Sequence, residues 1–183
     1  MKRLIASIVL LFIITSYLLS CEKDDLCAGD TPTTPGLVID FFQNDNATAK
    51  ETITKLYYYE TGSEKRDSIT NSSRLILPLK TDAESVKFSL EYVTTVPGQQ
   101  LPLVSTAEFE VHYSAKQTYL SRACGYKTTY TLIPGTIEVP NPTVRAVSPP
   151  PPANPWFTQA NIEVITTNIE IEEDDTQHIK IYI

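Results

Sequence analysis

The chain is poor in several residue types on which catalytic motifs depend. Among its 183 residues are six glycines, two histidines, three cysteines and one tryptophan. No Gly-x-Ser-x-Gly nucleophile elbow occurs, and the phosphate-binding loop and the dinucleotide-binding glycine fingerprint are both missing. We therefore expect a non-enzymatic protein. The alternative is an envelope hydrolase whose site is not visible in the sequence, because glycosidase carboxylates can come from any strands.

Positive charge is also scarce. Lysine and arginine number 15 against 22 aspartates and glutamates, which gives a net charge of −7. Without residues 1–20, which contain Lys2 and Arg3, the balance becomes 13 against 22, a net charge of −9. Such a surface repels phosphate backbones, so we expect no nucleic-acid partner.

The strongest positive signal lies in the first 21 residues. Two basic residues precede a mostly apolar run from Leu4 to Leu19, and Ser20 and Cys21 follow it. These features form a secretory signal, and the cysteine at the first mature position makes it resemble a bacterial lipoprotein signal. We expect residues 1–20 to be removed and Cys21 to carry lipid that holds the protein at the outer membrane. The alternatives are a single transmembrane anchor and cleavage without lipidation.

The two remaining cysteines, Cys27 and Cys124, form an even pair once Cys21 is assigned to the lipid. Exported proteins fold in an oxidising compartment, so we predict one disulfide that closes a loop of about 100 residues. Two free thiols are the alternative, if the fold keeps the two residues far apart.

Residues 21–35 are polar and contain several threonines and prolines, which is typical of an extended, lipidated tether. Within it, Lys23-Asp24-Asp25 resembles the surface-export signal of Bacteroidetes-type lipoproteins. An ordinary acidic linker is the alternative. The sequence therefore allows two locations for the protein, the cell surface and the periplasmic face of the outer membrane.

From Gly36 onward, apolar residues recur with a period of two, as in Ser85–Tyr92, where four apolar residues alternate with four polar ones. This alternation predicts strands with one buried face. Roughly eight or nine short strands predict one all-β domain over residues 36–183, an antiparallel, immunoglobulin-like β-sandwich. An up-and-down barrel is the alternative. The predicted strands span residues 37–42, 52–59, 74–79, 85–92, 108–113, 127–132, 162–166, 169–172 and 179–183.

Residues 140–156 interrupt the strand pattern with seven prolines. Proline lacks the amide donor that a central strand needs, so we expect a rigid surface loop. Trp156 closes this loop and either packs it against the sandwich or contributes to a binding surface.

The best indication of ligand binding is the run Tyr57-Tyr58-Tyr59. In a strand, Tyr57 and Tyr59 share one face and Tyr58 lies on the other. If Tyr57 and Tyr59 face outward, they form an aromatic platform on which sugar rings could stack, with Trp156 as a further candidate. The alternative is that one face of the run fills the core and the rest covers a sheet edge.

The two histidines lie near carboxylates. His112 shares the outward face of its strand with Glu108 and Glu110, and His178 follows the acidic run 172–175. Three residues in a flat row about 7 Å apart converge poorly on one ion, and the acidic run lacks the spacing of a calcium loop. We therefore predict a polar strand face and a charged hairpin tip, with no metal and no cofactor.

Five segments of the chain together resemble a known family. They are 21–27, 33–42, 77–81, 120–127 (Leu-Ser-Arg-Ala-Cys-Gly-Tyr-Lys) and 172–183. The family that they resemble is an uncharacterised family of Bacteroidetes lipoproteins. The resemblance implies a lipid on Cys21 and a structural partnership of Cys27 and Cys124, but no activity. We expect a lipid-anchored protein that binds or scaffolds in the cell envelope, with the membrane and either an envelope protein or a glycan as partner.

Overall fold

The computed structural model describes residues 27, 31, 33–95, 102–138, 143–145, 161–170 and 176–183. The chain divides into two units. The hairpin unit comprises residues up to Thr31 together with Tyr119–Tyr126, and the sandwich unit comprises Pro32–Thr118 and Lys127–Ile183. No helix in the described residues has the length and apolar character needed to cross a membrane.

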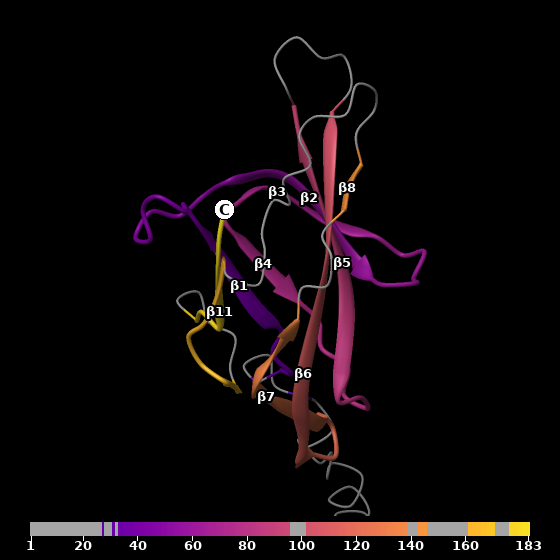
Figure 1. The fold of residues 1–183 in the computed structure, drawn as a ribbon. Helices are drawn as coiled ribbons and strands as arrows, with labels where there is room; N and C mark the ends of the chain where they lie inside the picture. Colours follow the sequence, from indigo (N-terminus) through magenta and orange to yellow (C-terminus); the bar gives the residue numbers. More distant parts are fainter. Residues whose placement is uncertain are drawn as a thin grey trace, which may run out of the picture. The chain divides into compact units, whose positions relative to one another are not determined.

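The sandwich unit is all β, as predicted, and its strands form two sheets (Figure 1). Sheet A has the strand order β4-β1-β11-β9, and sheet B has the order β10-β7-β6-β5-β2-β3, with β8 paired to β6. The described residues thus contain eleven strands, where roughly eight or nine were expected. The strands are β1 (Leu37–Phe42), β2 (Ile53–Glu60), β3 (Asp67–Ser72), β4 (Arg74–Leu77), β5 (Ser85–Thr94), β6 (Leu103–Ser121), β7 (Gly125–Glu138), β8 (Thr143–Arg145), β9 (Ile162–Val164), β10 (Asn168–Ile169) and β11 (Ile179–Tyr182).

One strand pair departs from the expected antiparallel arrangement. β1 and β11 run parallel, with Ile39 opposite Ile179 and Phe41 opposite Ile181. β4 and β9 then flank this pair in antiparallel register. The alternating pattern shows which face of a strand is buried, but it does not show the direction of its neighbour, so this pairing could not be derived from the sequence. The immunoglobulin-like detail of the prediction stays a prediction.

The core lies between the two sheets. Ile39 and Phe41 of sheet A and Leu56, Phe88 and Phe109 of sheet B belong to one buried apolar cluster. Burial of an apolar side chain of this size contributes about 1.5–3 kcal/mol, so the cluster supplies the main driving force for the fold. All six residues of β1 are buried, which identifies it as the central strand of sheet A.

Two regions form strands without an apolar alternation. β3 has the sequence DSITNS, with Ile69 as its only apolar residue, and it forms because it pairs with β2 along its length. β6 extends beyond the predicted 108–113 to Ser121, and Ser114–Tyr119 are exposed on both faces. Pairing with β7, not burial, holds this extension in the strand conformation.

Two predicted boundaries differ from the structure. β8 lies inside the predicted proline-rich loop, where Thr143–Arg145 pair with Val104–Thr106, so the loop prediction is wrong for these three residues. Their sequence, Thr-Val-Arg, is free of proline and can pair. At the end of the predicted tether, the Thr34 hydroxyl accepts a hydrogen bond from the Thr128 amide at 3.0 Å, and Pro35 is buried. These two residues therefore belong to the sandwich unit.

Candidate functional site

The tyrosine run of β2 divides between the two faces of sheet B, as predicted. Leu56 is fully buried and Tyr58 packs against the core, so Tyr57 and Tyr59 lie on the outward face. Both outward rings are half-buried and neither belongs to the core. The core-filling part of the alternative thus applies to Tyr58, and the ligand role of Tyr57 and Tyr59 stays a prediction.

Each outward ring has a cation beside it. The Lys55 Nζ lies 4.8 Å from the centre of the Tyr57 ring, and the Arg66 guanidinium carbon lies 4.5 Å from the centre of the Tyr59 ring. The negative face of an aromatic ring attracts a cation at this distance. We call Lys55, Tyr57, Tyr59 and Arg66 the aromatic-cation strip.

Tyr59 is held in place by a carboxylate on the neighbouring strand. Its hydroxyl donates to Glu91 Oε1 at 2.8 Å, and Arg66 Nη1 pairs with Glu91 Oε2 at 3.0 Å. Burial raises the pKa of the Tyr59 phenol above its ordinary value, and the Glu91 carboxylate raises it further. Tyr59 is thus a neutral hydrogen-bond donor with a fixed ring, and the positive charge of Arg66 beside it is already paired with Glu91.

Tyr57 has a different environment because its cation has no acidic partner in the described part of the chain. The Lys55 Nζ donates to Ser68 Oγ at 3.0 Å and to Thr70 Oγ1 at 3.2 Å, both hydroxyls of edge strand β3. Hydrogen bonds to neutral hydroxyls are weaker than those to a carboxylate. The Lys55 ammonium is therefore the cation of the strip most available to a polar or anionic ligand.

A groove of about 250 Å³ opens beside Tyr59. Val86, Phe88 and Leu79 supply apolar side chains to it, and the Lys80–Glu60 ion pair lies at its rim. The polar lining is completed by Ser63, Lys65 and Asp67. Apolar walls with a few polar groups are typical of small-molecule sites, although most such sites are larger.

Two buried tyrosines fix the segment that forms one wall of this groove. The Tyr113 hydroxyl accepts from the Lys80 amide and donates to the Lys80 carbonyl, both at 3.0 Å. The Tyr130 hydroxyl donates to the Leu79 carbonyl at 3.1 Å. A second groove of about 290 Å³ shares Pro78 and Leu79 with the first and is otherwise lined by Thr34, Pro35, Gly36 and Ile76.

The His112 row carries paired charges. Lys87 Nζ lies 3.8 Å from Glu108 Oε2 and 3.5 Å from Glu110 Oε2, and His112 Nε2 lies 3.6 Å from Glu110 Oε1. A lysine between the carboxylates occupies the place that a metal ion would need. Among the described residues, no group of three histidine, cysteine or acidic side chains has a geometry that could hold a metal.

His178 is a structural residue of sheet A. It is 1% exposed, and its Nδ1 accepts a hydrogen bond from the Val38 amide at 2.9 Å. Its own amide donates to the Val38 carbonyl at 3.1 Å, and its carbonyl accepts from Ile165. Neither His112 nor His178 lines either of the two grooves, and Glu110 does not line them either.

A buried carboxylate in sheet A, bonded to three side-chain donors, was not anticipated from the sequence. Asp40 is 1% exposed and forms a bidentate pair with Arg74, at 2.7 Å from Nε and 3.0 Å from Nη2. Lys50 Nζ and Gln177 Nε2 donate to Asp40 Oδ2 at 2.9 and 3.0 Å. Burial raises the pKa of the Asp40 carboxyl, but the hydrogen bonds and charges of Arg74 and Lys50 outweigh it and hold that pKa below its ordinary value. The signal in the sequence was an aspartate inside the apolar run Leu37–Phe42, because a buried charge requires a partner.

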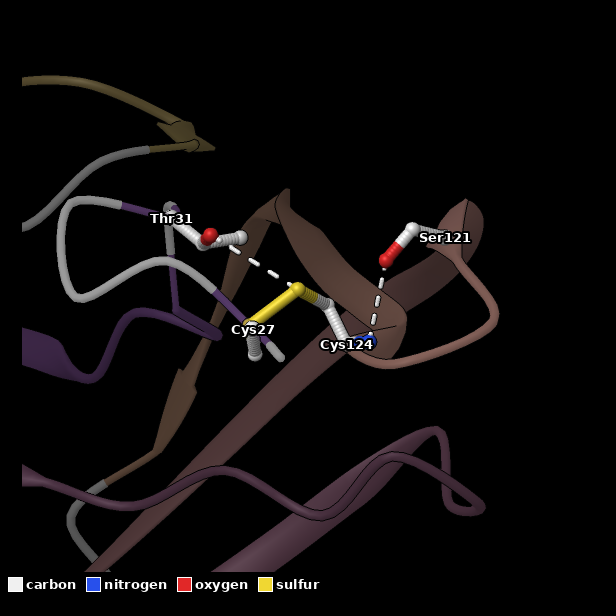
Figure 2. Close-up of a disulfide and its surroundings, with 4 residues drawn as sticks. All are labelled: Cys27, Thr31, Ser121 and Cys124. Carbon is white, nitrogen blue, oxygen red and sulfur yellow. Dashed lines mark hydrogen bonds between the residues drawn. A yellow bond between two sulfur atoms is a disulfide. The ribbon is translucent and has the colours of Figure 1, made fainter. Parts of the chain in front are cut away.

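The hairpin unit contains the predicted disulfide. Cys27 and Cys124 are joined with a Cα–Cα distance of 4.9 Å, and 97 positions separate them in the sequence (Figure 2). The Cys124 amide donates to Ser121 Oγ at 3.0 Å, and Thr31 Oγ1 lies 3.6 Å from the Cys124 sulfur (Figure 2). In the chain-entropy account, closing a loop of this length stabilises the fold by about 4–5 kcal/mol.

Several predicted residues lie outside the described residues, and their roles stay predictions. They are the lipidation residue Cys21, the candidate ligand residue Trp156, the Lys23-Asp24-Asp25 signal and the acidic run at 172–175. In comparisons with known proteins, no family model, no curated protein and no solved structure matches the chain.

Proposed function

We propose that this protein is a lipid-anchored, non-enzymatic binding module of the outer membrane. Its lipoprotein-type start supports anchoring through Cys21, and the sandwich unit supplies a folded domain with its own buried core. The observation that carries binding is the aromatic-cation strip, where two outward tyrosines lie beside two cations on one strand face.

The ligand class that this geometry favours is a glycan. Sugar rings stack their C–H faces on aromatic rings, while hydroxyl, ammonium and carboxylate groups hydrogen-bond to sugar hydroxyls. Tyr57 supplies a ring, Lys55, Ser68 and Thr70 supply polar groups around it, and Glu91 adds a carboxylate beside Tyr59. We assign the main stacking role to Tyr57, because the Tyr59 hydroxyl and its neighbour Arg66 are both bonded to Glu91, whereas Lys55 beside Tyr57 bonds to neutral hydroxyls.

The binding test is retention of the mature chain on immobilised envelope and host glycans. Replacing both strip tyrosines (Tyr57→Ala, Tyr59→Ala) should weaken retention at least about tenfold, since truncating a central aromatic residue typically costs 1.4 kcal/mol or more. Tyr126→Ala, an exposed tyrosine of the hairpin unit, is the matched control and should retain binding. Unchanged melting temperatures would show that the variants are folded, and a wild-type chain that binds no glycan would overturn the proposed ligand class.

Anchoring has its own test. The mature protein should carry acyl groups on Cys21 by mass spectrometry, and Cys21→Ala should leave the chain in the soluble envelope fraction. Protease treatment of intact cells, with a periplasmic protein as control, then distinguishes surface exposure from a periplasmic location.

The non-enzymatic assignment is tested by incubating the protein with the glycans that it retains. The hydrolase alternative predicts that the protein releases shorter sugars from these glycans. If that release persists when Tyr57 and Tyr59 are replaced but stops when Glu110 or His112 is replaced, the protein is a hydrolase and the non-enzymatic assignment is wrong.

A further inference from the structure

We propose that the end of the β6–β7 hairpin, presented by Tyr119 and Tyr126, docks on the lipid surface that carries the anchor. The inference rests on the proposed function in one respect, the lipid on Cys21. It goes beyond that function because it assigns a second, non-covalent membrane contact to residues far from Cys21 in the sequence.

The disulfide sets a short limit on the distance between the hairpin and the lipid. Six peptide units separate Cys21 from Cys27, and an extended chain spans at most about 3.6 Å per residue. Cys27 Cα lies 4.9 Å from Cys124 Cα. Cys124 therefore stays within roughly 25 Å of the lipid-bearing residue, whatever conformation the intervening residues adopt. Without the disulfide, Pro35 would be the first residue fixed by the sandwich core. An extended chain from Cys21 to Pro35 spans about twice the distance from Cys21 to Cys124.

The residues that the disulfide keeps near the lipid are unusually exposed aromatics. Tyr126 is 66% exposed and Tyr119 is 57% exposed, and the other large apolar residues classed as exposed reach 46% at most. The two rings contact each other edge to face, with centroids 5.4 Å apart. Tyrosine combines an apolar ring with a polar hydroxyl, and it is enriched where hydrocarbon meets water in membrane proteins.

The charge of this region suits a lipid surface, although the whole chain is acidic. Residues 114–133 contain Lys116, Arg122 and Lys127 and have no acidic residue. Arg122 lies in the turn between the two tyrosines and is exposed. A basic segment next to anionic headgroups gains favourable electrostatic energy, which the acidic remainder of the chain does not. Aromatic exposure, local positive charge and the length of the tether thus agree on one occupant, a bilayer surface.

The test uses the lipidated full-length protein in vesicles of phosphatidylethanolamine and phosphatidylglycerol with brominated acyl chains. Trp156→Phe removes the only tryptophan, and Tyr119→Trp or Tyr126→Trp then places a single reporter in the hairpin. We expect the emission of either reporter to shift to shorter wavelength and to be quenched by the brominated lipid. A Tyr57→Trp reporter on the sandwich unit is the control and should be quenched less.

A second readout does not need a reporter. Trypsin should cut the free protein after Arg122 and should cut the vesicle-bound protein more slowly, and Tyr119→Ser with Tyr126→Ser should restore cutting on vesicles. Both tyrosines are exposed, so the double variant should keep its fold, which its melting temperature checks.

The outcomes separate the two proposals. If the protein floats with vesicles but the hairpin reporters are quenched no more than the control, docking is overturned and anchoring stands. If mass spectrometry finds no lipid on Cys21, anchoring fails and the distance argument for docking falls with it. Stronger quenching at both hairpin positions, lost when Cys27→Ser and Cys124→Ser lengthen the tether, supports docking.

Discussion

The outward faces of the two sheets differ in how far their polar side chains are exposed to solvent. On sheet A, Val38, Asp40 and Phe42 alternate with core residues, yet all three are buried, and the Asp40 carboxylate is 1% exposed. On sheet B, the outward Glu91 side chain is 17% exposed, and other outward charges reach 40%. Each face has a carboxylate that pairs with an arginine, but only one of them is removed from water.

This difference indicates that the polar groups of the two faces have different roles. A buried charge is costly to strip of its partners, whereas an exposed pair contributes about 0–1 kcal/mol. Sheet A therefore uses its buried charge to hold β1, β4 and Gln177, two residues before β11, together. Sheet B leaves its charges and outward tyrosines partly exposed, which is what the proposed binding role requires.

The largest expected effect comes from removing the buried carboxylate. Asp40→Ala leaves Arg74, Lys50 and Gln177 without their common acceptor, and we expect a loss of about 3–5 kcal/mol in the free energy of unfolding. Urea denaturation measures it. A loss below about 1 kcal/mol would show that solvent replaces the carboxylate and that the two faces do not differ.

The buried histidine of the same sheet should give the next effect. His178→Ala removes the acceptor of the Val38 amide and leaves a cavity, so we expect a loss of about 2–4 kcal/mol. His112→Ala on sheet B is the matched control and should change stability by less than about 0.5 kcal/mol. Equal losses for the two variants would contradict the comparison.

Acid should act on sheet A through Asp40. Its folded pKa lies below the ordinary value of 3.8, so the unfolded chain binds more protons as pH falls, and the stabilisation present above pH 3.8 is lost as pH drops through the folded pKa. Unfolding measured at pH 6 and again below pH 3.8 should therefore show a smaller acid-induced loss in Asp40→Asn than in the wild type. The same loss in both chains would assign acid sensitivity to other carboxylates.

The partly exposed Glu91 carboxylate should matter far less for stability than Asp40 does. Glu91→Ala should cost less than about 1 kcal/mol, because solvent screens its pair with Arg66. It frees Arg66 and the Tyr59 hydroxyl, so glycan retention should change more than stability does. A loss as large as that of Asp40→Ala would show that Glu91 is also a structural anchor.

The smallest stability change is expected for Lys55→Ala, whose partners in the described residues are the hydroxyls of Ser68 and Thr70. We expect a change within about 0.5 kcal/mol and weaker retention of acidic glycans compared with neutral ones. If Lys55→Ala binds acidic and neutral glycans more weakly to the same extent, Lys55 supports the Tyr57 ring and does not contact a charge on the ligand.

The predictable parts of the fold are strands whose own sequence carries the signal, either a continuous apolar run or an alternation of apolar and polar residues. Residues 37–42 coincide with β1, and the alternation in β2 correctly placed Tyr57 and Tyr59 on one face. β3 and the extension of β6 were missed, because they are held by pairing with a neighbour and not by burial of one face.

The site was predictable only where its residues share a strand. Lys55 stands two residues before Tyr57, so alternation could have identified it as a neighbour. Arg66 and Glu91 come from other segments, and their approach to Tyr59 depends on the register of β2 with β5, where Tyr57 lies opposite Glu91. The partners of Asp40 are further away still, with Arg74 34 residues later and Gln177 137 residues later.

The parallel pairing of β1 with β11 also has a consequence for the proposed export. Val38 and His178, which bond where the two strands meet, are 140 positions apart. A chain that crosses a membrane from its N-terminus delivers β1 early, with β4 as its available neighbour in sheet A, and its other edge stays open until β11 has emerged. Sheet A can therefore close only after nearly the whole domain has been translocated. If the chain is exported as proposed, the bare edge of β1 would be the natural target for a chaperone that accompanies it.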